Sequence, residues 1–270
     1  MNCTILGATG FIGSHLRAQL SADGHACYLP ARDDPELFLR DLGHVFYCIG
    51  LTADFRQRPF DTVRAHASLL ADVLERAHFD SLLYLSSTRV YQHGDEAKET
   101  SALMVNSNDP SDLYNLSKLM GESLCLSCGR DNVRVARLSN VYGRDFHSGN
   151  FLFALIREAV DSGSIVLRSA PDSAKDYIGV HDVARLLPQV ALSGKHQVYN
   201  IASGRNVTNE ALVARMVEIT GSYVEIAAGA KIIRFPTIDT TRVREDFGFT
   251  ASSVLADLPS LVQQYRDEKT

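Results

Sequence analysis

Tyr114 and Lys118 are the two residues whose types and spacing best suit proton chemistry in this sequence. The segment that carries them has the pattern of a helix, in which side chains at i and i+4 share one face. We therefore expect the Lys118 ammonium beside the Tyr114 phenol. A fixed positive charge there favours the phenolate and lowers the phenol pKa from its usual value of about 10. Such a tyrosine can act as a general acid or base, although Tyr-x-x-x-Lys also occurs by chance in many helices.

A glycine-rich turn at the N-terminus predicts a dinucleotide site. Residues 2–6 form an apolar strand, three glycines follow at a spacing of three, and a helical pattern begins within them. Glycines so placed allow a tight turn, close approach of backbone N–H groups to a pyrophosphate, and close packing of helix on strand. The residues expected to contact the cofactor here are Gly7, Thr9, Gly10, Phe11, Ile12 and Gly13.

The second strand, residues 26–30, ends in Ala31-Arg32-Asp33-Asp34, where a ribose-reading side chain would stand. An acid at this place accepts hydrogen bonds from the 2′-hydroxyl and repels a 2′-phosphate. Ala31 occupies the acid's position and Arg32 follows it, so the pattern prefers NADP, which a guanidinium binds through bidentate bonds. The two acids that follow could reverse this preference, and NAD is the alternative. A second alternative is that Arg32 is only a solvated turn residue.

The chain then leaves room for only one short helix, at 35–43, before the apolar strand 44–49. Gly50 and Leu51 follow at the carboxyl end of that strand, the edge where parallel sheets bind ligands, and we expect them at the cofactor. A long amphipathic helix is predicted at about 60–77. Its inward residues are expected to be Val63, Leu70, Val73 and Leu74.

Another apolar strand, residues 81–85, runs into three consecutive hydroxyl residues, Ser86, Ser87 and Thr88. Hydroxyls at the carboxyl end of a central strand are placed to hydrogen-bond a reacting oxygen. Together with the tyrosine and lysine downstream, they indicate an active site rather than an ordinary turn.

Composition limits the class of protein. The chain has 270 residues, is 45% apolar and carries a formal charge of −5, as expected for a soluble protein of one large domain or two packed ones. No apolar run reaches the ~20 residues of a membrane span, so we expect a cytoplasmic protein with no membrane partner. The absence of a Lys/Arg cluster argues against nucleic acid. The five cysteines are interpreted as core residues, and no metal site is expected.

The order of six motifs resembles the sugar-nucleotide epimerase/dehydratase branch of the extended short-chain dehydrogenase/reductase superfamily. The resemblance covers nearly the whole chain. It rests on GATGFIG at 7–13, SSTRVY at 86–91, YNLSK at 114–118, RLSNVYG at 137–143, KDYIGVHDVA at 175–184 and YNIASGRNVT at 199–208.

The resemblance implies an α/β fold: a Rossmann-type doubly wound parallel sheet with a small C-terminal α/β substrate-binding lobe. The NAD(P)-binding core is expected at 1–141 and the lobe mainly at 142–270, with about 176–202 returning to the Rossmann sheet near Val180 and at 198–202. It also implies a homodimer formed through helices near 60–78 and 111–128.

The resemblance further implies the catalytic roles. Tyr114 would be the acid/base at a sugar hydroxyl, Lys118 would lower its pKa and hold the nicotinamide ribose, and Ser87 would hydrogen-bond the same oxygen. A hydride would move between a sugar carbon and the nicotinamide, and we expect this carbon to be C4.

For the substrate, a nucleotide-diphosphate sugar, the resemblance assigns residues near the phosphates, the sugar and the entrance to the lobe. Lys175 stands where the family has an arginine, which keeps the charge but loses the bidentate fork. For Arg234, a surface charge is an equal alternative. The expected substrate-binding residues are Thr88, Arg89, Asn140, Asn150, Phe151, Lys175, Tyr177 and Arg234.

Thr88 and Arg89 also narrow the reaction. Dehydratases resembling this chain carry carboxylates directly after the active-site hydroxyl, and 3,5-epimerases carry a cysteine at the place of Arg89. We therefore expect 4-epimerisation or reduction of a 4-keto sugar, with 4,6-dehydration disfavoured. The alternative from another class is a dinucleotide-binding sensor or a non-catalytic assembly protein on the same fold. Retention of both Tyr114 and Lys118 favours the enzyme.

Overall fold

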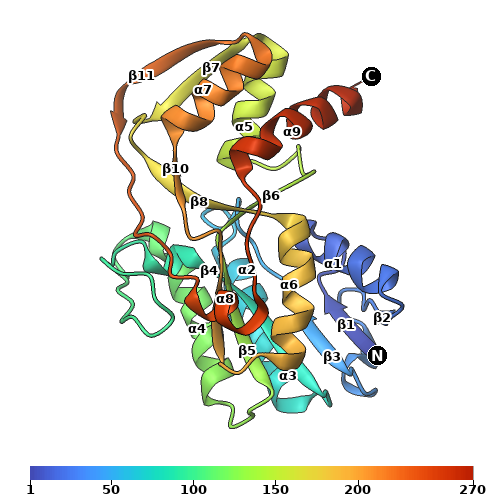
Figure 1. Cartoon of the computed structure of the whole chain (residues 1–270). Coiled ribbons are helices and arrows are strands. Elements are labelled where there is room, and N and C mark those ends of the chain that lie inside the picture. Colours follow the sequence, from blue (N-terminus) through green and yellow to red (C-terminus); the bar gives the residue numbers. More distant parts are fainter. Residues whose placement is uncertain (270) are drawn as a thin grey trace.

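The computed structural model describes residues 1–269, which form a large α/β unit and a smaller lobe above it (Figure 1). Six parallel strands make the central sheet of the large unit, in the order β2-β1-β3-β4-β5-β9. These strands are β1 (Asn2–Leu6), β2 (Ala26–Tyr28), β3 (His44–Tyr47), β4 (Ser81–Ser87), β5 (Val133–Leu138) and β9 (Val198–Ile201). The expected doubly wound parallel sheet is confirmed.

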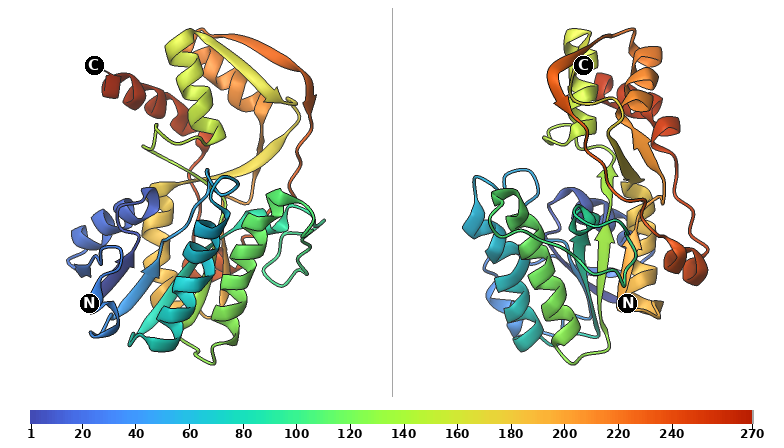
Figure 2. Two further views of the ribbon diagram at one scale, coloured as in Figure 1. Left: turned by 180° about the vertical axis from the view of Figure 1, so that it is seen from behind. Right: turned by 90° about the vertical axis from the view of Figure 1, so that its left-hand side faces the viewer.

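Helices cover both faces of this sheet (Figure 2). One face carries α1 (Phe11–Ala22), α6 (Val180–Ser193) and α8 (Thr241–Phe247), and the other carries α2 (Pro59–Val63), α3 (Leu69–Arg76) and α4 (Leu113–Ser127). Because both faces are covered, the strands are apolar almost throughout. Among residues 1–269, no helix has both the length and the apolar composition needed to cross a bilayer.

The helix expected at 60–77 is continuous but not uniform. A π-helical turn, Arg64–Ser68, separates α2 from α3. Leu70, Val73 and Leu74 are buried as predicted, but Val63 is 39% exposed, so its inward assignment was wrong. The π turn contains wider i→i+5 bonds, which rotate the face of α2 relative to that of α3.

The link between β2 and β3 is short, as expected, and contains only a 3₁₀ turn at Pro35–Phe38. No further strand is inserted in that link, and β3 pairs directly with β1. The carboxyl ends of β1 and β3 therefore lie side by side while the chain connections leave them in opposite directions. This is the switch point at which open α/β sheets bind ligands.

The lobe contains two small sheets with their own apolar core. The first pairs β8 (Ala174–Gly179) with β6 (Asn140–Tyr142) and β10 (Asn206–Thr208), and the second pairs β7 (Ser164–Ser169) with β11 (Tyr223–Lys231). Its helices are α5 (Phe151–Arg157, continued by a π turn to Ser162), α7 (Asn209–Thr220) and α9 (Val254–Lys269). The expectation that the strand near Val180 extends the large sheet was wrong, because β8 pairs with β6 after the chain has left β5.

Candidate active site

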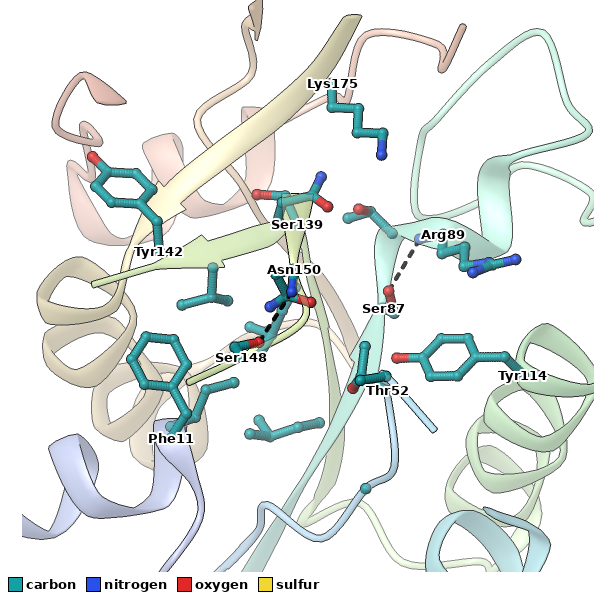
Figure 3. Close-up of a pocket in the computed structure, with 18 of the residues that line it drawn as sticks. Phe11, Thr52, Ser87, Arg89, Tyr114, Ser139, Tyr142, Ser148, Asn150 and Lys175 are labelled. Carbon is teal, nitrogen blue, oxygen red and sulfur yellow. Dashed lines mark hydrogen bonds between the residues drawn. The ribbon is translucent and has the colours of Figure 1, made fainter. Parts of the chain in front are cut away.

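A cavity of about 820 Å³ lies where the carboxyl ends of the central strands meet the lobe (Figure 3). Its wall combines residues from the glycine turn, the ends of β3 and β4, helix α4, and the lobe. The fold therefore brings together predicted residues that are far apart in the sequence. Those that line the cavity are Gly10, Phe11, Ile12, Gly50, Ser87, Thr88, Arg89, Tyr114, Lys118, Asn140, Asn150, Phe151, Lys175 and Tyr177.

The glycine turn has the shape and polarity that a pyrophosphate needs. Gly7 has a φ of +85°, and a Cβ there would lie 3.1 Å from the backbone of Cys48. A Cβ on Gly13 would collide with the Gly7 carbonyl oxygen. Helix α1 begins after Gly10 with no side-chain cap and no acid in its first turn, so its N–H groups and positive dipole end remain available to an anion. The residues present therefore fit a dinucleotide.

Tyr114 lies in the first turn of α4 with its hydroxyl directed at those of Ser87 and Thr52 (Figure 3). Ser87 is the last residue of β4, and its Oγ accepts a hydrogen bond from the Arg89 N–H at 3.2 Å. This bond caps a 3₁₀ turn, Thr88–Tyr91, and fixes the Ser87 side chain. Three hydroxyls converge on one point of the cavity, as required for binding and deprotonating a carbinol.

The electrostatics of Tyr114 differ from the prediction. Burial raises the pKa of Tyr114, while hydrogen bonding from Ser87 and Thr52 and the charge of Arg89 act to lower it. The Arg89 guanidinium carbon lies 5.6 Å from the centre of the Tyr114 ring. The expected lowering of this pKa by Lys118 was therefore wrong, because the phenol is desolvated and the neighbouring cation that opposes this effect is Arg89.

Lys118 is buried and directed at the ends of the central strands. Its Nζ donates to the backbone oxygen of Leu85 at 2.8 Å. A Cβ on Gly50 would lie 3.3 Å from that Nζ, so the ammonium packs on the loop that follows β3. Burial lowers the pKa of Lys118 to about 7, and the negative charge of Glu122 acts in the opposite direction.

A buried polar network centred on Glu122 lies next to Lys118 and holds the elements that form this part of the cavity wall. Glu122, one helical turn after Lys118, accepts hydrogen bonds from Arg137 Nη2 at 2.6 Å and from Ser86 Oγ at 2.5 Å. Arg137 also donates to the Tyr91 hydroxyl at 2.6 Å. The network joins β4, β5 and α4, and within it the hydroxyl of Ser86, which also lines the cavity, is engaged with Glu122.

Cations and buried polar atoms line the cavity on the lobe strand β8 and on the turn after β4 that carries Arg89. Lys175 Nζ lies 5.6 Å from the Phe151 ring, and burial together with the charge of Arg89 lowers the Lys175 pKa. Arg89 Nε, Ser139 Oγ and Tyr177 Oη are buried with no hydrogen-bond partner within residues 1–269. Such atoms are rare unless a ligand or water completes them. In the same described part of the chain, no group of three metal-ligating side chains occurs.

Six predicted residues lie outside the cavity wall. Three of them, Gly7, Thr9 and Gly13, belong to the glycine turn described above. Arg32 is exposed on the loop after β2, and Arg234 is exposed with its backbone bridged to Ala174. The Arg234 alternative, a surface charge, agrees better with this position. Leu51 is half-buried, and its backbone N–H donates to His66 Nε2 at 3.2 Å. Asn140 does line the cavity, but its amide nitrogen is bonded to the Asp176 oxygen at 2.8 Å.

The structure also adds wall residues that the sequence analysis missed: Thr52, Phe55, Ser139 and Phe235. Thr52 directly follows the predicted Gly50 and Leu51, so the same strand-end rule could have included it. Phe55 and Phe235 come from irregular loops, where no periodic pattern marks a residue as part of a site.

A sequence profile of the NAD-dependent epimerase/dehydratase family matches residues 3–202. The chain belongs to this family. A dTDP-glucose 4,6-dehydratase from Streptomyces griseus is 29% identical over 213 residues, covering 74% of the chain and 63% of that protein, so the match spans less than two thirds of this relative. A GDP-6-deoxy-D-mannose reductase from Pseudomonas aeruginosa is 28% identical over 82% of the chain and 81% of its own length.

Among solved structures of this family's fold, MoeE5 in complex with UDP-glucose and NAD superimposes with a TM-score of 0.84. The alignment covers 100% of both chains at 22% sequence identity. At that identity the likeness establishes the Rossmann-type fold of this family member, and its reaction has to be argued from the cavity.

Proposed function

We propose that this epimerase/dehydratase family member transfers a hydride between NAD(P) and a ring carbon of a nucleotide-diphosphate sugar, by preference C4, as a 4-ketoreductase or a 4-epimerase. The observation that carries the proposal is the convergence of the Tyr114, Ser87 and Thr52 hydroxyls at one point of the cavity. It lies beside the glycine turn that fits a dinucleotide.

The chain's own residues supply the proton chemistry. When a carbinol becomes a ketone, Ser87 hydrogen-bonds the reacting oxygen and Tyr114 takes its proton, and in the reverse direction Tyr114 returns it. NAD(P), held at the glycine turn, would supply the hydride-transfer chemistry. Lys118, packed on Gly50 at the end of β3, is placed to hold the cofactor ribose.

The lobe side of the cavity supports a phosphorylated sugar. Lys175 and Arg89 are close enough for the Arg89 charge to lower the Lys175 pKa, so an anion bound between them relieves their repulsion. The unpartnered Ser139 and Tyr177 hydroxyls offer hydrogen bonds to sugar hydroxyls or phosphate oxygens. Tyr177 also supplies an apolar ring surface. These features favour a polar, anionic substrate.

Among the reactions of the family, 4-epimerisation and ketoreduction agree best with the residues around Ser87. Thr88 and Arg89 follow it, and neither is a carboxylate that could remove a proton from a second carbon. One relative is a 4,6-dehydratase. The reductase relative, however, matches more of the chain.

For the cofactor we propose NADP in preference to NAD. The carboxylate of Asp34 is engaged within its own loop, where it accepts hydrogen bonds from the Tyr28 hydroxyl at 2.9 Å and the Glu36 N–H at 3.0 Å. Arg32 remains exposed on the same loop and can approach a 2′-phosphate. Separate titrations with NADPH and NADH should give the tighter Kd for NADPH, and the preference should disappear in Arg32→Ala. Equal affinities in the unmodified protein would refute it.

We also propose a homodimer formed through α2, α3 and α4. Phe60 and Met120, on α2 and α4, are 77% and 57% exposed, so both helices carry a large apolar side chain that a second copy could cover. Sedimentation analysis should give twice the chain mass, and Met120→Asp should reduce the dimer fraction. A monomer at micromolar concentration would contradict the proposal.

The proposed reaction is tested by supplying UDP-, GDP-, CDP- and dTDP-sugars and their 4-keto forms. A ketoreductase should oxidise NADPH in step with loss of a 4-keto sugar. An epimerase should invert C4 with no net change in the nicotinamide. A product from which water has been eliminated across C5 and C6 of the sugar would count against the proposal. The same holds if the protein turns over none of these compounds.

A further inference from the structure

His66 is a fully buried histidine that the proposed reaction leaves unassigned. It lies in the π turn between α2 and α3, with a side chain that is 0% exposed. It is not part of the cavity wall, so it does not touch the substrate. Its ring nevertheless stands edge-on to the Tyr114 ring, with centres 5.3 Å apart. A π turn inside a helix often marks a functional position.

The two ring nitrogens of His66 bind two different parts of the site. Nε2 receives the hydrogen bond of the Leu51 N–H at 3.2 Å, in the loop after β3. Nδ1 lies 2.8 Å from Ser117 Oγ, and Ser117 Oγ donates to the backbone oxygen of Tyr114 at 2.9 Å. One imidazole therefore connects the loop on the cofactor side to the turn of α4 that carries the acid/base tyrosine.

These contacts fix the tautomer. A backbone N–H can only donate, so Nε2 is the acceptor and Nδ1 carries the hydrogen. The Ser117 hydroxyl donates its hydrogen bond to the backbone oxygen of Tyr114, so its oxygen can accept a hydrogen bond from His66 Nδ1. Burial and the charge of Lys118 lower the pKa of His66 to about 2, so the ring stays neutral and the chain of bonds stays intact.

Gly50 shows how closely this connection approaches the cofactor side. A Cβ on Gly50 would lie 3.2 Å from His66 Nε2 and 3.3 Å from Lys118 Nζ, so both nitrogens pack against the same glycine. Gly50 itself lines the cavity. Displacing the imidazole would therefore move the cavity wall at the point where Lys118 meets it.

We propose that His66 is a positioning residue that holds the Gly50–Leu51 loop against the cofactor and aligns it with the Tyr114 turn of α4. The inference rests on the proposed function, since it assumes a dinucleotide in the glycine turn. It adds a residue outside the cavity whose effect is on cofactor affinity.

Two substitutions separate this role from general packing. Glutamine can place an acceptor near the position of Nε2, whereas the shorter asparagine reaches only the position of Nδ1. With NADPH and NADH as probes, His66→Asn should weaken the Kd of the preferred nucleotide by about tenfold, the cost of leaving one buried N–H unpaired. His66→Gln should stay within about threefold of the unmodified protein because it keeps that bond.

His44→Asn is the matched control. His44 forms a similar bond to Ser81 Oγ, at 2.9 Å, at the opposite ends of β3 and β4. Because His44 makes this bond through Nδ1, whose position asparagine can reach, and lies far from the cavity, His44→Asn should leave the nucleotide Kd unchanged. Unchanged nucleotide affinity in His66→Asn would overturn the inference. So would a loss of affinity in His66→Gln and His44→Asn that is as large as the loss in His66→Asn. If the unmodified protein binds neither nucleotide, the proposed function itself fails and the inference fails with it.

Discussion

Lys118 Nζ donates a hydrogen bond to the backbone oxygen of Leu85 at 2.8 Å, which directs the ammonium at the end of β4. The cation that counteracts the raised pKa of Tyr114 is instead Arg89, whose guanidinium carbon lies 5.6 Å from the phenol ring. The sequence analysis expected Lys118 both to lower the pKa of Tyr114 and to hold the nicotinamide ribose. In the structure the first of these effects comes from Arg89. Arg89 favours the phenolate, and Lys118 packs on Gly50 in the loop after β3.

The first prediction concerns Arg89. Removing its charge in Arg89→Gln should raise the pKa of Tyr114 further, because burial then acts with less opposition. The limb of the kcat/KM profile that reports this tyrosine should move to higher pH. Arg89→Lys, which keeps a charge, should give a smaller shift. Identical limbs in Arg89→Gln and the unmodified enzyme would show that Arg89 does not act on Tyr114.

The second prediction uses the lowered pKa of Lys118, about 7 in the folded protein against 10.5 ordinarily. Between these values the unfolded chain binds more protons than the folded one, so the free energy of unfolding should rise with pH. Urea unfolding of the cofactor-free protein at pH 7 and pH 9 measures this rise. Lys118→Met should lack that part of the slope, and parallel pH dependences for the two proteins would contradict the assignment.

The third prediction concerns Glu122, whose side chain is 3% exposed and paired with Arg137. Glu122→Gln leaves the Arg137 charge buried without its partner and should cost about 3–5 kcal/mol of unfolding free energy. Asp61→Asn, in an exposed pair with Arg58, is the control and should cost at most about 1 kcal/mol. Equal losses in chemical denaturation would mean that the buried network contributes little.

Much of the fold and the site could be predicted because glycine spacing, strand-end hydroxyls and apolar periodicity are local signals. The glycine turn, the strand that ends at Ser87 and the helix that carries Tyr114 all follow from such patterns. The family resemblance then predicted that Lys175 and Tyr177 lie at the substrate, and both line the cavity that contains Ser87 and Tyr114. No short sequence pattern could have predicted this contact between the central sheet and the lobe.

The errors arose where contacts are set by distant elements. The direction of Lys118 depends on the Leu85 carbonyl, and the desolvation of Tyr114 depends on packing that no i, i+4 rule contains. Val63 was misplaced because a π turn changes the helical phase. His66 was not singled out because a single histidine in an apolar helix gives no indication of two specific partners.

The central claim is that Tyr114 moves the substrate proton, and Tyr114→Phe tests it most directly. Turnover of the best nucleotide sugar should fall by about 10²–10⁴-fold, since only the hydroxyl is removed, while the nucleotide Kd stays near that of the unmodified enzyme. Turnover within a few-fold of the unmodified enzyme, with the cofactor still bound, would contradict the account.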